Sequence, residues 1–317
     1  MSIFSKIRAQ LFSINTNRYY DLIRKEYKVK LVKEDVPPIA IFCLDSRTYF
    51  VGFADRLKGM VSCYAYAKAV GIPFRIEHIA PFDLSDYFVP NKYDWQVKSG
   101  EKSYNLLYAN PVFLMSCYNS VKRLSKLNIK RQHHLYTNGS FVNIINDKYN
   151  KKYVFGDLFA ELFKPSLRLE NKLYEQKLKI GGNYVSVSFR FMQLMGDFND
   201  WKGEILTEED KIDLLEKSLI IVRQIYEKEK KTVIVTSDSQ TFIDAVSKLD
   251  FVYVIPGTIG HIGFSQDDGV IEKTIIDFCM ISQADHVYNA YSGKMYRGAF
   301  ARIAACSTNT LYTEITY

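Results

Sequence analysis

Apolar positions in the first half of the chain predict one β–α–β unit, followed by a segment without a clear period. A short apolar run after a proline pair is typical of a buried strand, and a stripe that includes Leu57, Met60 and Tyr64 is typical of an amphipathic helix. Residues 80–150 mix aromatic and polar positions, and only one strand is predicted there. The elements predicted for this half are strands at 39–44, 74–77 and 104–108 and helices at 55–68 and 153–163.

The second half alternates strands and helices throughout. Its longest helix begins at Thr207, and Asp210, three residues on, completes a capping-box pattern. Strands that alternate with helices form a parallel sheet covered on both faces, so this half is predicted to be a doubly wound α/β domain. The predicted elements are strands at 184–190, 232–237, 251–255 and 286–289 and helices at 207–228, 240–249, 270–283 and 294–305.

A charged stretch at 164–182, which ends in a glycine pair, predicts the boundary between the two halves. A chain of 317 residues is long enough for two domains. We therefore expect domains at 34–170 and 171–317, preceded by a separate N-terminal segment, 1–33.

The positive charge of the chain is concentrated in that N-terminal segment. Residues 1–33 hold eight Lys and Arg against two acids, so they carry +6 of the total formal charge of +7. Nucleic-acid-binding proteins more often spread charge over the body, so no nucleic-acid partner is expected. Ile3, Ile7 and Leu11 stand at helical spacing in the same segment. Two interpretations follow: a basic amphipathic helix on an anionic membrane surface, or a helix packed on the body with a solvated basic face.

Composition is that of a globular protein, since 47% of residues are hydrophobic and 24% are charged, which excludes a disordered chain and a coiled coil. No apolar run reaches the ~18 residues of a membrane span. The five cysteines are scattered, and neither they nor the histidines stand at ligand spacing. We therefore expect free thiols, a cytoplasmic protein and no metal site. The glycine motifs of dinucleotide-binding and P-loop proteins and the signatures of α/β-hydrolases and zincins are absent.

Polar side chains follow three predicted strands of the second half. Arg190 comes after the first, Ser237 and Asp238 close the second, and Ser292 and Gly293 follow the last and open a predicted helix. Ligands of open α/β sheets bind beyond the carboxyl ends of the strands, where an arginine can grip a diphosphate and a helix N-terminus attracts phosphate. Each residue also has a structural interpretation, a surface ion pair for the arginine and a turn or helix cap for the others.

Four motifs, in their order along the chain, resemble motifs of the fucosyltransferase superfamily, which includes the α-1,6-, nodulation and protein O-fucosyltransferases. Residues 282–302 (SQADHVYNAYSGKMYRGAFAR) resemble its last donor-binding motif, with Arg297 at the arginine of the helix. Residues 187–190 (VSFR) resemble its H-x-R strand, and residues 235–238 (VTSD) resemble its TDD strand end. In the first half, residues 52–59 (GFADRLKG) resemble its glycine-rich turn.

The resemblance implies an α/β fold of the glycosyltransferase-B kind, in which two Rossmann-like domains face a cleft. It implies an inverting, metal-independent transferase without other cofactors, which moves fucose from GDP-fucose to a glycan or lipid-linked glycan. Residues 34–170 would form the acceptor side and 171–317 the nucleotide-sugar side. Arg190 would neutralise the leaving diphosphate, and Ser292 with the following helix N-terminus would hold phosphate.

Two departures from the family pattern leave other functions open. Ser188 stands in place of a histidine and Gly293 in place of a small hydroxyl residue, which is compatible with a transferase for another nucleotide sugar. No residue is an unambiguous base for activating an acceptor hydroxyl. Together with the basic segment, this also allows a non-catalytic glycan-assembly module, peripheral at the inner membrane surface. The candidates for the base are acids of a predicted loop and a helix start: Asp55, Asp197, Asp200 and Glu204.

Overall fold

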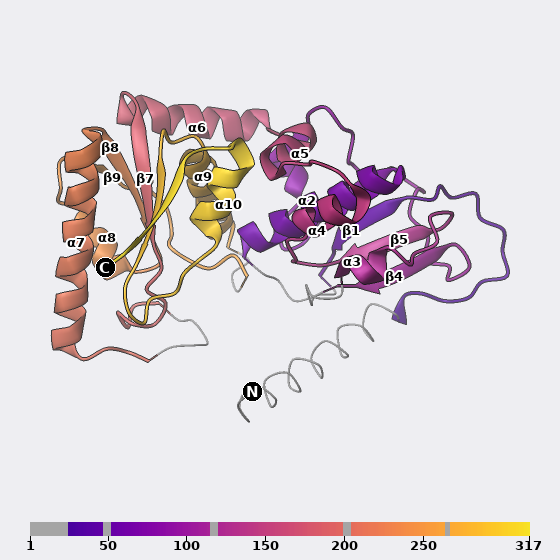
Figure 1. Ribbon diagram of the computed structural model, residues 1–317, viewed down its shortest axis with the longest axis horizontal. Coiled ribbons are helices and arrows are strands. Elements are labelled where there is room, and N and C mark those ends of the chain that lie inside the picture. The colour runs from indigo at the N-terminus through magenta and orange to yellow at the C-terminus, as the bar shows by residue number, and fades with distance from the viewer. Residues whose placement is uncertain (1–24, 47–51, 115–119, 199–203, 264–266) are drawn as a thin grey trace. The chain divides into compact units, whose positions relative to one another are not determined.

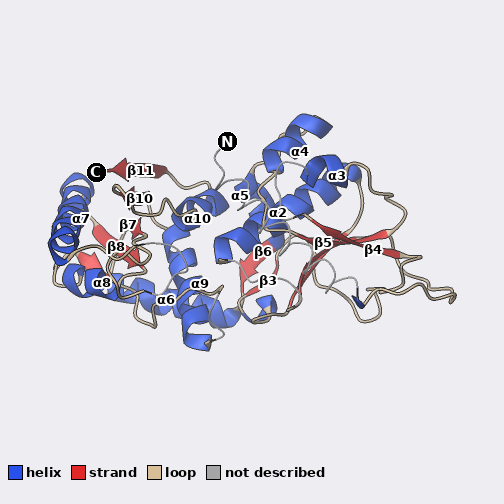
Figure 2. Ribbon diagram, turned by 90° about the horizontal axis from the view of Figure 1, so that it is seen from below, coloured by secondary structure: helices blue, strands red, loops and turns tan. Residues whose placement is uncertain are grey.

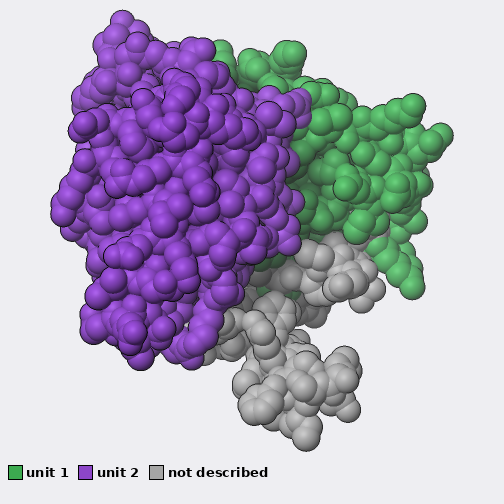
Figure 3. Space-filling model, turned by 60° about the vertical axis from the view of Figure 1, so that its left-hand side comes forward, with its two compact units in different colours: residues 1–51, 55–85, 89–164 green, residues 52–54, 86–88, 165–317 purple. Residues whose placement is uncertain are grey.

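The computed structural model describes residues 25–46, 52–114, 120–198, 204–263 and 267–317. The chain divides into two compact units (Figure 3), and each contains its own parallel sheet. Unit 1 comprises residues 1–51, 55–85 and 89–164, and unit 2 comprises residues 52–54, 86–88 and 165–317. The α/β fold predicted from the sequence is confirmed in both units.

Unit 1 is built on four parallel strands, β1 (Ala40–Leu44), β2 (Phe74–His78), β4 (Ala109–Phe113) and β5 (Gln132–Tyr136). They lie in the order β2-β1-β5-β4 (Figure 1). The chain passes from β1 through α2 (Phe53–Val70) to β2, which confirms the predicted β–α–β unit. The other short elements of residues 80–165 are η1 (Leu84–Asp86), β3 (Phe88–Pro90), α3 (Ser120–Leu124), α4 (Val142–Tyr149), α5 (Phe155–Leu162) and β6 (Phe163–Pro165), and β3 pairs with β6.

Helix α2 approaches the sheet closely because residue 59 is a glycine. A Cβ at this position would lie 2.8 Å from Cε2 of Phe42 in β1 and closer still to the carbonyl oxygen of Thr137. Any side chain at Gly59 would therefore push α2 away from the strands that it covers.

The strand predicted at 104–108 is wrong, because the strand of this region is β4, which starts at Ala109. Pro111 in β4 argues against a strand from sequence alone, but β4 lies at the edge of the sheet, where proline is tolerated. The residues just before β4 are instead joined to the N-terminal segment by a bridge between Lys28 and Asn105. Residues 1–24 of the predicted amphipathic segment lie outside the described residues.

The charged stretch predicted as a boundary is a helix, α6 (Leu167–Ile180). Ser166 caps its start, and Gly181, with φ 73°, ends it. Leu169 and Leu173 on one face are buried, so the charged residues are the solvated face of a helix and not a linker. The passage from unit 1 to unit 2 lies at 164–165, whereas the boundary expected at 170 falls inside α6.

Unit 2 is a doubly wound domain with five parallel strands in the order β11-β10-β7-β8-β9. The strands are β7 (Tyr184–Phe189), β8 (Thr232–Ser237), β9 (Val252–Tyr253), β10 (Val287–Tyr291) and β11 (Tyr312–Thr316). The helices besides α6 are α7 (Glu208–Glu229), α8 (Gln240–Val246), α9 (Asp268–Ser282) and α10 (Phe300–Thr308). Helices α7 and α8 cover one face of the sheet, and α9 and α10 cover the other (Figures 1 and 2).

At the end of unit 2 one predicted helix has the wrong bounds and one strand was not predicted. The helix predicted at 294–305 begins only at Phe300, since Gly293 has φ 48° and the N–H of Tyr296 donates to the carbonyl of Arg190 at 3.0 Å. Strand β11, which no pattern predicted, pairs with β10 at the edge of the sheet.

The described cysteines Cys43, Cys63, Cys279 and Cys306 are free, as predicted, and Cys117 lies outside the described residues. In the part of the chain that the structure describes, no helix combines the length and the apolar character needed to cross a membrane.

Candidate functional site

The sheet of unit 2 changes its winding direction between β7 and β10. From β7 the chain continues to β8 and β9 on one side, and then to β10 and β11 on the other. Ligands of open α/β sheets bind beyond the carboxyl ends of the strands at such a switch point. Arg190 follows β7, Ser292 follows β10 and Asp238 follows the neighbouring β8. The structure thus brings these predicted residues together at the carboxyl ends of the strands.

Asp238 holds Arg190 in position. Arg190 Nε lies 3.2 Å from Asp238 Oδ2, and the guanidinium lies over the ring of Phe198, 4.9 Å from its centroid. The Asp238 carboxylate also accepts the backbone N–H groups of Phe191 and Met192, each at 2.8 Å. Asp238 therefore fixes both the arginine and the backbone that follows it, which makes it a positioning residue.

The electrostatics of this pair reflect its burial, since Asp238 is only 5% exposed. Burial raises the pKa of Asp238, while the charge of Arg190 and the N–H groups of Phe191 and Met192 oppose that rise. Ser237 beside it accepts the N–H of Ser239 at 3.1 Å, a contact within the turn that starts α8.

A row of buried polar side chains crosses the sheet one residue before the ends of β7 and β8. The hydroxyl groups of Ser188 and Thr236 share a hydrogen bond of 2.7 Å, and Ser188 is paired in register with Asn289 of β10. Among the described residues, Asn289 Nδ2 and Ser186 Oγ form no hydrogen bond of good geometry, although the Asn289 side chain faces the Tyr312 hydroxyl and opposes the rise in the pKa of that group. An unpaired buried donor is unfavourable, so Asn289 marks a place where a bound molecule would complete the hydrogen bonding.

No role is predicted from the sequence for Thr236 or Asn289, although both lie inside motifs that the sequence singles out. Thr236 could have been found from the two-residue period of side chains along a strand. Ser188 and Thr236 stand two positions before Arg190 and Asp238, which is the spacing of residues that share one face of a strand. Asn289 is found only through the register of β10 with β7.

The helix start predicted directly after Ser292 is wrong, because residues 292–299 form a loop and α10 starts at Phe300. Phosphate binding by Ser292 itself stays a prediction. The carbonyl of Ser292 accepts the N–H of Met295 at 2.8 Å, which closes a turn at Gly293. Arg297 lies in the same loop rather than in the helix, and it forms an ion pair with Glu314 of β11.

The predicted base candidates that the structure describes each have a structural partner. Asp197 accepts the hydroxyl of Ser239 at 2.8 Å and the N–H of Thr241 at 2.7 Å, and so supports the start of α8. Glu204 forms an ion pair with Lys294. Asp55 is in the first turn of α2 and pairs with Lys58, and Asp200 lies outside the described residues.

The strand ends of unit 1 hold a second cluster of buried charge. The side-chain ligand atoms of Cys43, Asp45 and Glu77 all lie within 4.8 Å of one another, as in a metal site. However, Lys102 forms an ion pair with Glu77, and its Nζ lies 3.7 Å from Asp45. Burial opposes the charge of Lys102, but the surrounding anionic groups raise its pKa overall. The lysine ammonium thus supplies the positive charge that a metal would bring.

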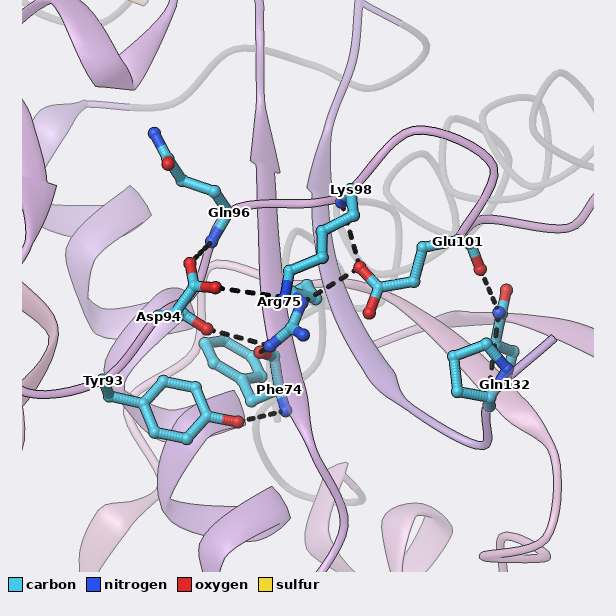
Figure 4. A network of polar contacts seen from close by, with 9 residues as sticks. Phe74, Arg75, Tyr93, Asp94, Gln96, Lys98, Glu101 and Gln132 are labelled. Carbon is cyan, nitrogen blue, oxygen red and sulfur yellow. Dashed lines mark hydrogen bonds and ion pairs between the residues drawn. The ribbon is translucent and has the colours of Figure 1, made fainter.

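Arg75 ties the loop after β2 to the sheet of unit 1 (Figure 4). Its Nε pairs with Glu101 at 3.0 Å, and its Nη1 donates to the carbonyls of Phe74 and Asp94 at 3.0 and 2.8 Å. The Tyr93 hydroxyl accepts the N–H of Phe74 at 2.7 Å. These bonds end on protein groups, so the network is structural.

Solved structures of NodZ α-1,6-fucosyltransferase share the architecture described above. Those soaked with GDP-fucose and co-crystallised with GDP give TM-scores of 0.53 and 0.52, at 13% sequence identity, over 86% of this chain and 92% of the NodZ chain. The chain has a fucosyltransferase fold. A structure of NodZ from Bradyrhizobium gives a TM-score of 0.51 with the same identity and coverage. No protein-family model and no curated protein sequence matches the chain.

The shared fold confirms the α/β fold that the resemblance of the four motifs implied. Within it, the observations that point to chemistry are Arg190 at the switch point, its support by Asp238, and the buried N–H group of Asn289, which forms no hydrogen bond of good geometry with any described residue.

Proposed function

We propose that the chain is an inverting glycosyltransferase that transfers fucose from GDP-fucose to a hydroxyl of a glycan or lipid-linked glycan without a metal ion. The observation that carries the proposal is Arg190, held by Asp238 at 3.2 Å at the switch point of a fucosyltransferase fold. Arginine is a permanent cation with five N–H donors, so one side chain can bind several oxygens of a diphosphate.

In this reaction the oxygen of the acceptor hydroxyl attacks the anomeric carbon of the sugar and loses its proton, which ends in the solvent. The bond from that carbon to the diphosphate oxygen breaks, and its electron pair leaves with GDP. Negative charge develops on the diphosphate as the bond breaks, and a cation already fixed in place stabilises that charge without reorganisation. Arg190 would thus have the electrostatic role that a divalent cation has in metal-dependent transfer. We assign no base for the acceptor proton, because Asp55, Asp197 and Glu204 have structural partners.

The polar row is the second part of the proposed donor site. Asn289 Nδ2 is a buried donor that forms no hydrogen bond of good geometry with any described residue, and a nucleotide diphosphate is rich in acceptors. Ser188 and Thr236 lie beside it across the strands and leave a short, polar surface. We assign these three residues to the nucleotide side of the site.

A second candidate function is transfer from another nucleotide sugar. Its support is Ser188, whose short hydroxyl is bonded to Thr236 at 2.7 Å where the family pattern has histidine. Turnover of a panel of nucleotide sugars separates the two candidates. Transfer from GDP-mannose or a UDP-sugar, and none from GDP-fucose, would decide for the second.

The decisive binding test is thermal unfolding with GDP, UDP and ADP for the wild type and for Arg190→Ala. A ligand at ~100 times its Kd stabilises the native state by about 2.7 kcal/mol, a shift of several degrees for a chain of this size. We expect a shift with GDP alone, and its loss in Arg190→Ala. Arg223→Ala, on the exposed side of α7, is the matched control and should keep the shift.

An unchanged GDP shift in Arg190→Ala would overturn the role of Arg190. Absence of a shift with every nucleotide, and of transfer with every donor and acceptor, would favour a non-catalytic glycan-assembly module. Any donor-dependent transfer excludes that module.

A further inference from the structure

Residues 28–33 of unit 1 form a loop of three lysines and three apolar residues, all of which are exposed. Leu31 is 94% exposed, and Val29 and Val32 are 62% and 63% exposed. Single apolar residues on a surface are ordinary, but three within four positions form a local apolar patch. The loop contains three lysines and no acid; of the two acids that follow it, Glu34 accepts the hydroxyl of Ser103 and Asp35 is exposed.

The backbone of this basic–apolar loop is anchored, so the exposure is built into unit 1. Lys28 is bridged to the segment before β4, with its N–H donating to the carbonyl of Tyr104 at 3.2 Å. The side chain of Asn105, itself fully buried, accepts the N–H of Lys30 at 3.1 Å and donates to the Lys30 carbonyl at 2.8 Å. A buried asparagine thus holds the middle of the loop, while Leu31 points to solvent rather than to the core.

We propose that the basic–apolar loop docks unit 1 on the anionic surface of a membrane. Exposed apolar side chains can enter the headgroup boundary, while lysines interspersed among them meet lipid phosphates and carboxylates. A protein partner would need a fixed carboxylate opposite each lysine and a shaped apolar pocket between them. A fluid anionic bilayer meets both needs at once, and the charge of the loop is complementary to it.

The test is co-sedimentation of the full chain with phosphatidylcholine vesicles, with or without about one-third phosphatidylserine. We expect binding to the anionic vesicles only, weakened by high salt because the lysine contribution is screened. Replacing the three lysines by glutamine should weaken binding about a hundredfold, which is about fivefold, or ~1 kcal/mol, for each lysine. Leu31→Ser should weaken it about tenfold or more through lost apolar burial.

Helix α6 offers a matched control, because Lys177, Leu178 and Lys179 repeat the pattern on unit 2 and are also exposed. Leu178 is 62% exposed, as Val29 is. The variant Lys177→Gln/Leu178→Ser/Lys179→Gln should bind vesicles like the wild type. Circular dichroism and thermal unfolding of each variant show whether the exposed substitutions leave the fold intact.

Four outcomes overturn the proposal. They are no binding by the wild type, equal binding to neutral vesicles, unchanged binding by the loop variants, and an equal loss in the α6 control. If removal of residues 1–24 abolishes binding while the loop variants bind normally, the N-terminal segment and not the loop is the membrane contact. None of these outcomes depends on the nucleotide site of unit 2.

Discussion

The two parallel sheets both end in buried charge, but they use that charge differently. At the strand ends of unit 1, Lys102 lies beside the carboxylates of Asp45 and Glu77, and Tyr136 donates to Asp45 at 3.2 Å. At the strand ends of unit 2, Asp238 holds Arg190, and the buried N–H group of Asn289 forms no hydrogen bond of good geometry with any described residue.

Buried charged groups that pair with one another stabilise a fold. Buried hydrogen-bond donors that remain unpaired are available to a ligand. Buried charge alone therefore does not identify a binding site. The difference between the two sheet edges supports the proposal that the ligand binds at unit 2 and that the cluster of unit 1 stabilises the fold. Substitutions at each edge should separate these roles.

The largest effect is expected for Lys102→Met in unit 1. Removing the lysine leaves the buried carboxylate of Asp45 and the partly buried carboxylate of Glu77 without their cation, so we expect the free energy of unfolding to fall by about 3–5 kcal/mol, measured by urea unfolding. Lys217→Met breaks an exposed pair with Asp213 on α7 and should cost less than about 1 kcal/mol. A loss in Lys102→Met as small as that of the control would contradict the comparison.

In unit 2, Asp238→Asn should weaken binding more than folding. The variant loses the ion pair with Arg190, and an amide can accept only one of the two N–H groups that the carboxylate accepts. We expect GDP affinity to fall about ten- to a hundredfold, equivalent to about 1.5–3 kcal/mol, by isothermal titration calorimetry. Asp213→Asn on α7 is the matched control, and an affinity as low as that of Asp238→Asn would show that the effect is not specific to the pair.

The pH dependence of stability should report on unit 1 through His78. Burial, followed by the charge of Arg56, lowers the pKa of His78 from 6.5 to about 3. The unfolded chain binds a proton below pH 6.5 and the folded chain does not, so stability is lost as the pH falls from 6.5 towards 3 and is unaffected above that window.

At pH 5 the free energy of unfolding should be lower by about 2 kcal/mol than at pH 7.5 because of His78. Urea unfolding at the two pH values measures the loss, and His78→Gln should reduce it. An identical loss in the variant would assign the pH dependence to other groups.

The smallest effect, and the sharpest contrast with Lys102, is expected for Asn289→Leu. Because the buried N–H group forms no hydrogen bond of good geometry with any described residue, we expect stability without ligand to change by less than about 1 kcal/mol or to rise. GDP affinity should nevertheless fall about fivefold or more. Thermal unfolding with and without GDP measures both quantities, with Asn171→Leu on the exposed face of α6 as control. A large loss of stability without ligand would show that Asn289 has a structural partner.

Periodicity predicted the elements whose faces are buried, and it failed where a distant contact decides the local structure. Helix α7 starts as predicted, with Thr207 Oγ1 accepting the N–H of Asp210 at 3.2 Å. The helix predicted after Ser292 starts late because the loop before it is bonded to Arg190, about a hundred residues earlier in the chain. That bond leaves no local pattern in the sequence.

The same distinction applies to the candidate site. The strand ends that carry Arg190 and Asp238 could be located, since polar residues follow apolar runs there. Their contact could not, because it depends on the register of β7 and β8, which pairs Phe189 with Ser237 and so places the next residues side by side. The cluster around Lys102 was missed for a similar reason, as its members come from three separate segments of the chain.

The membership of residues 52–54 and 86–88 in unit 2 has a consequence for how the protein is synthesised and for how it can be recombined. Phe53 is 1% exposed and packs edge-on against Phe278, with ring centroids 5.2 Å apart, and Phe88 stacks beside Phe53 at 6.2 Å. During synthesis Phe53 and Phe88 are made long before Phe278, so their burial in unit 2 has to wait for the rest of that unit. A recombination event that exchanged the two halves near residue 165 as cassettes would separate these aromatic rings, so both halves have to be inherited together.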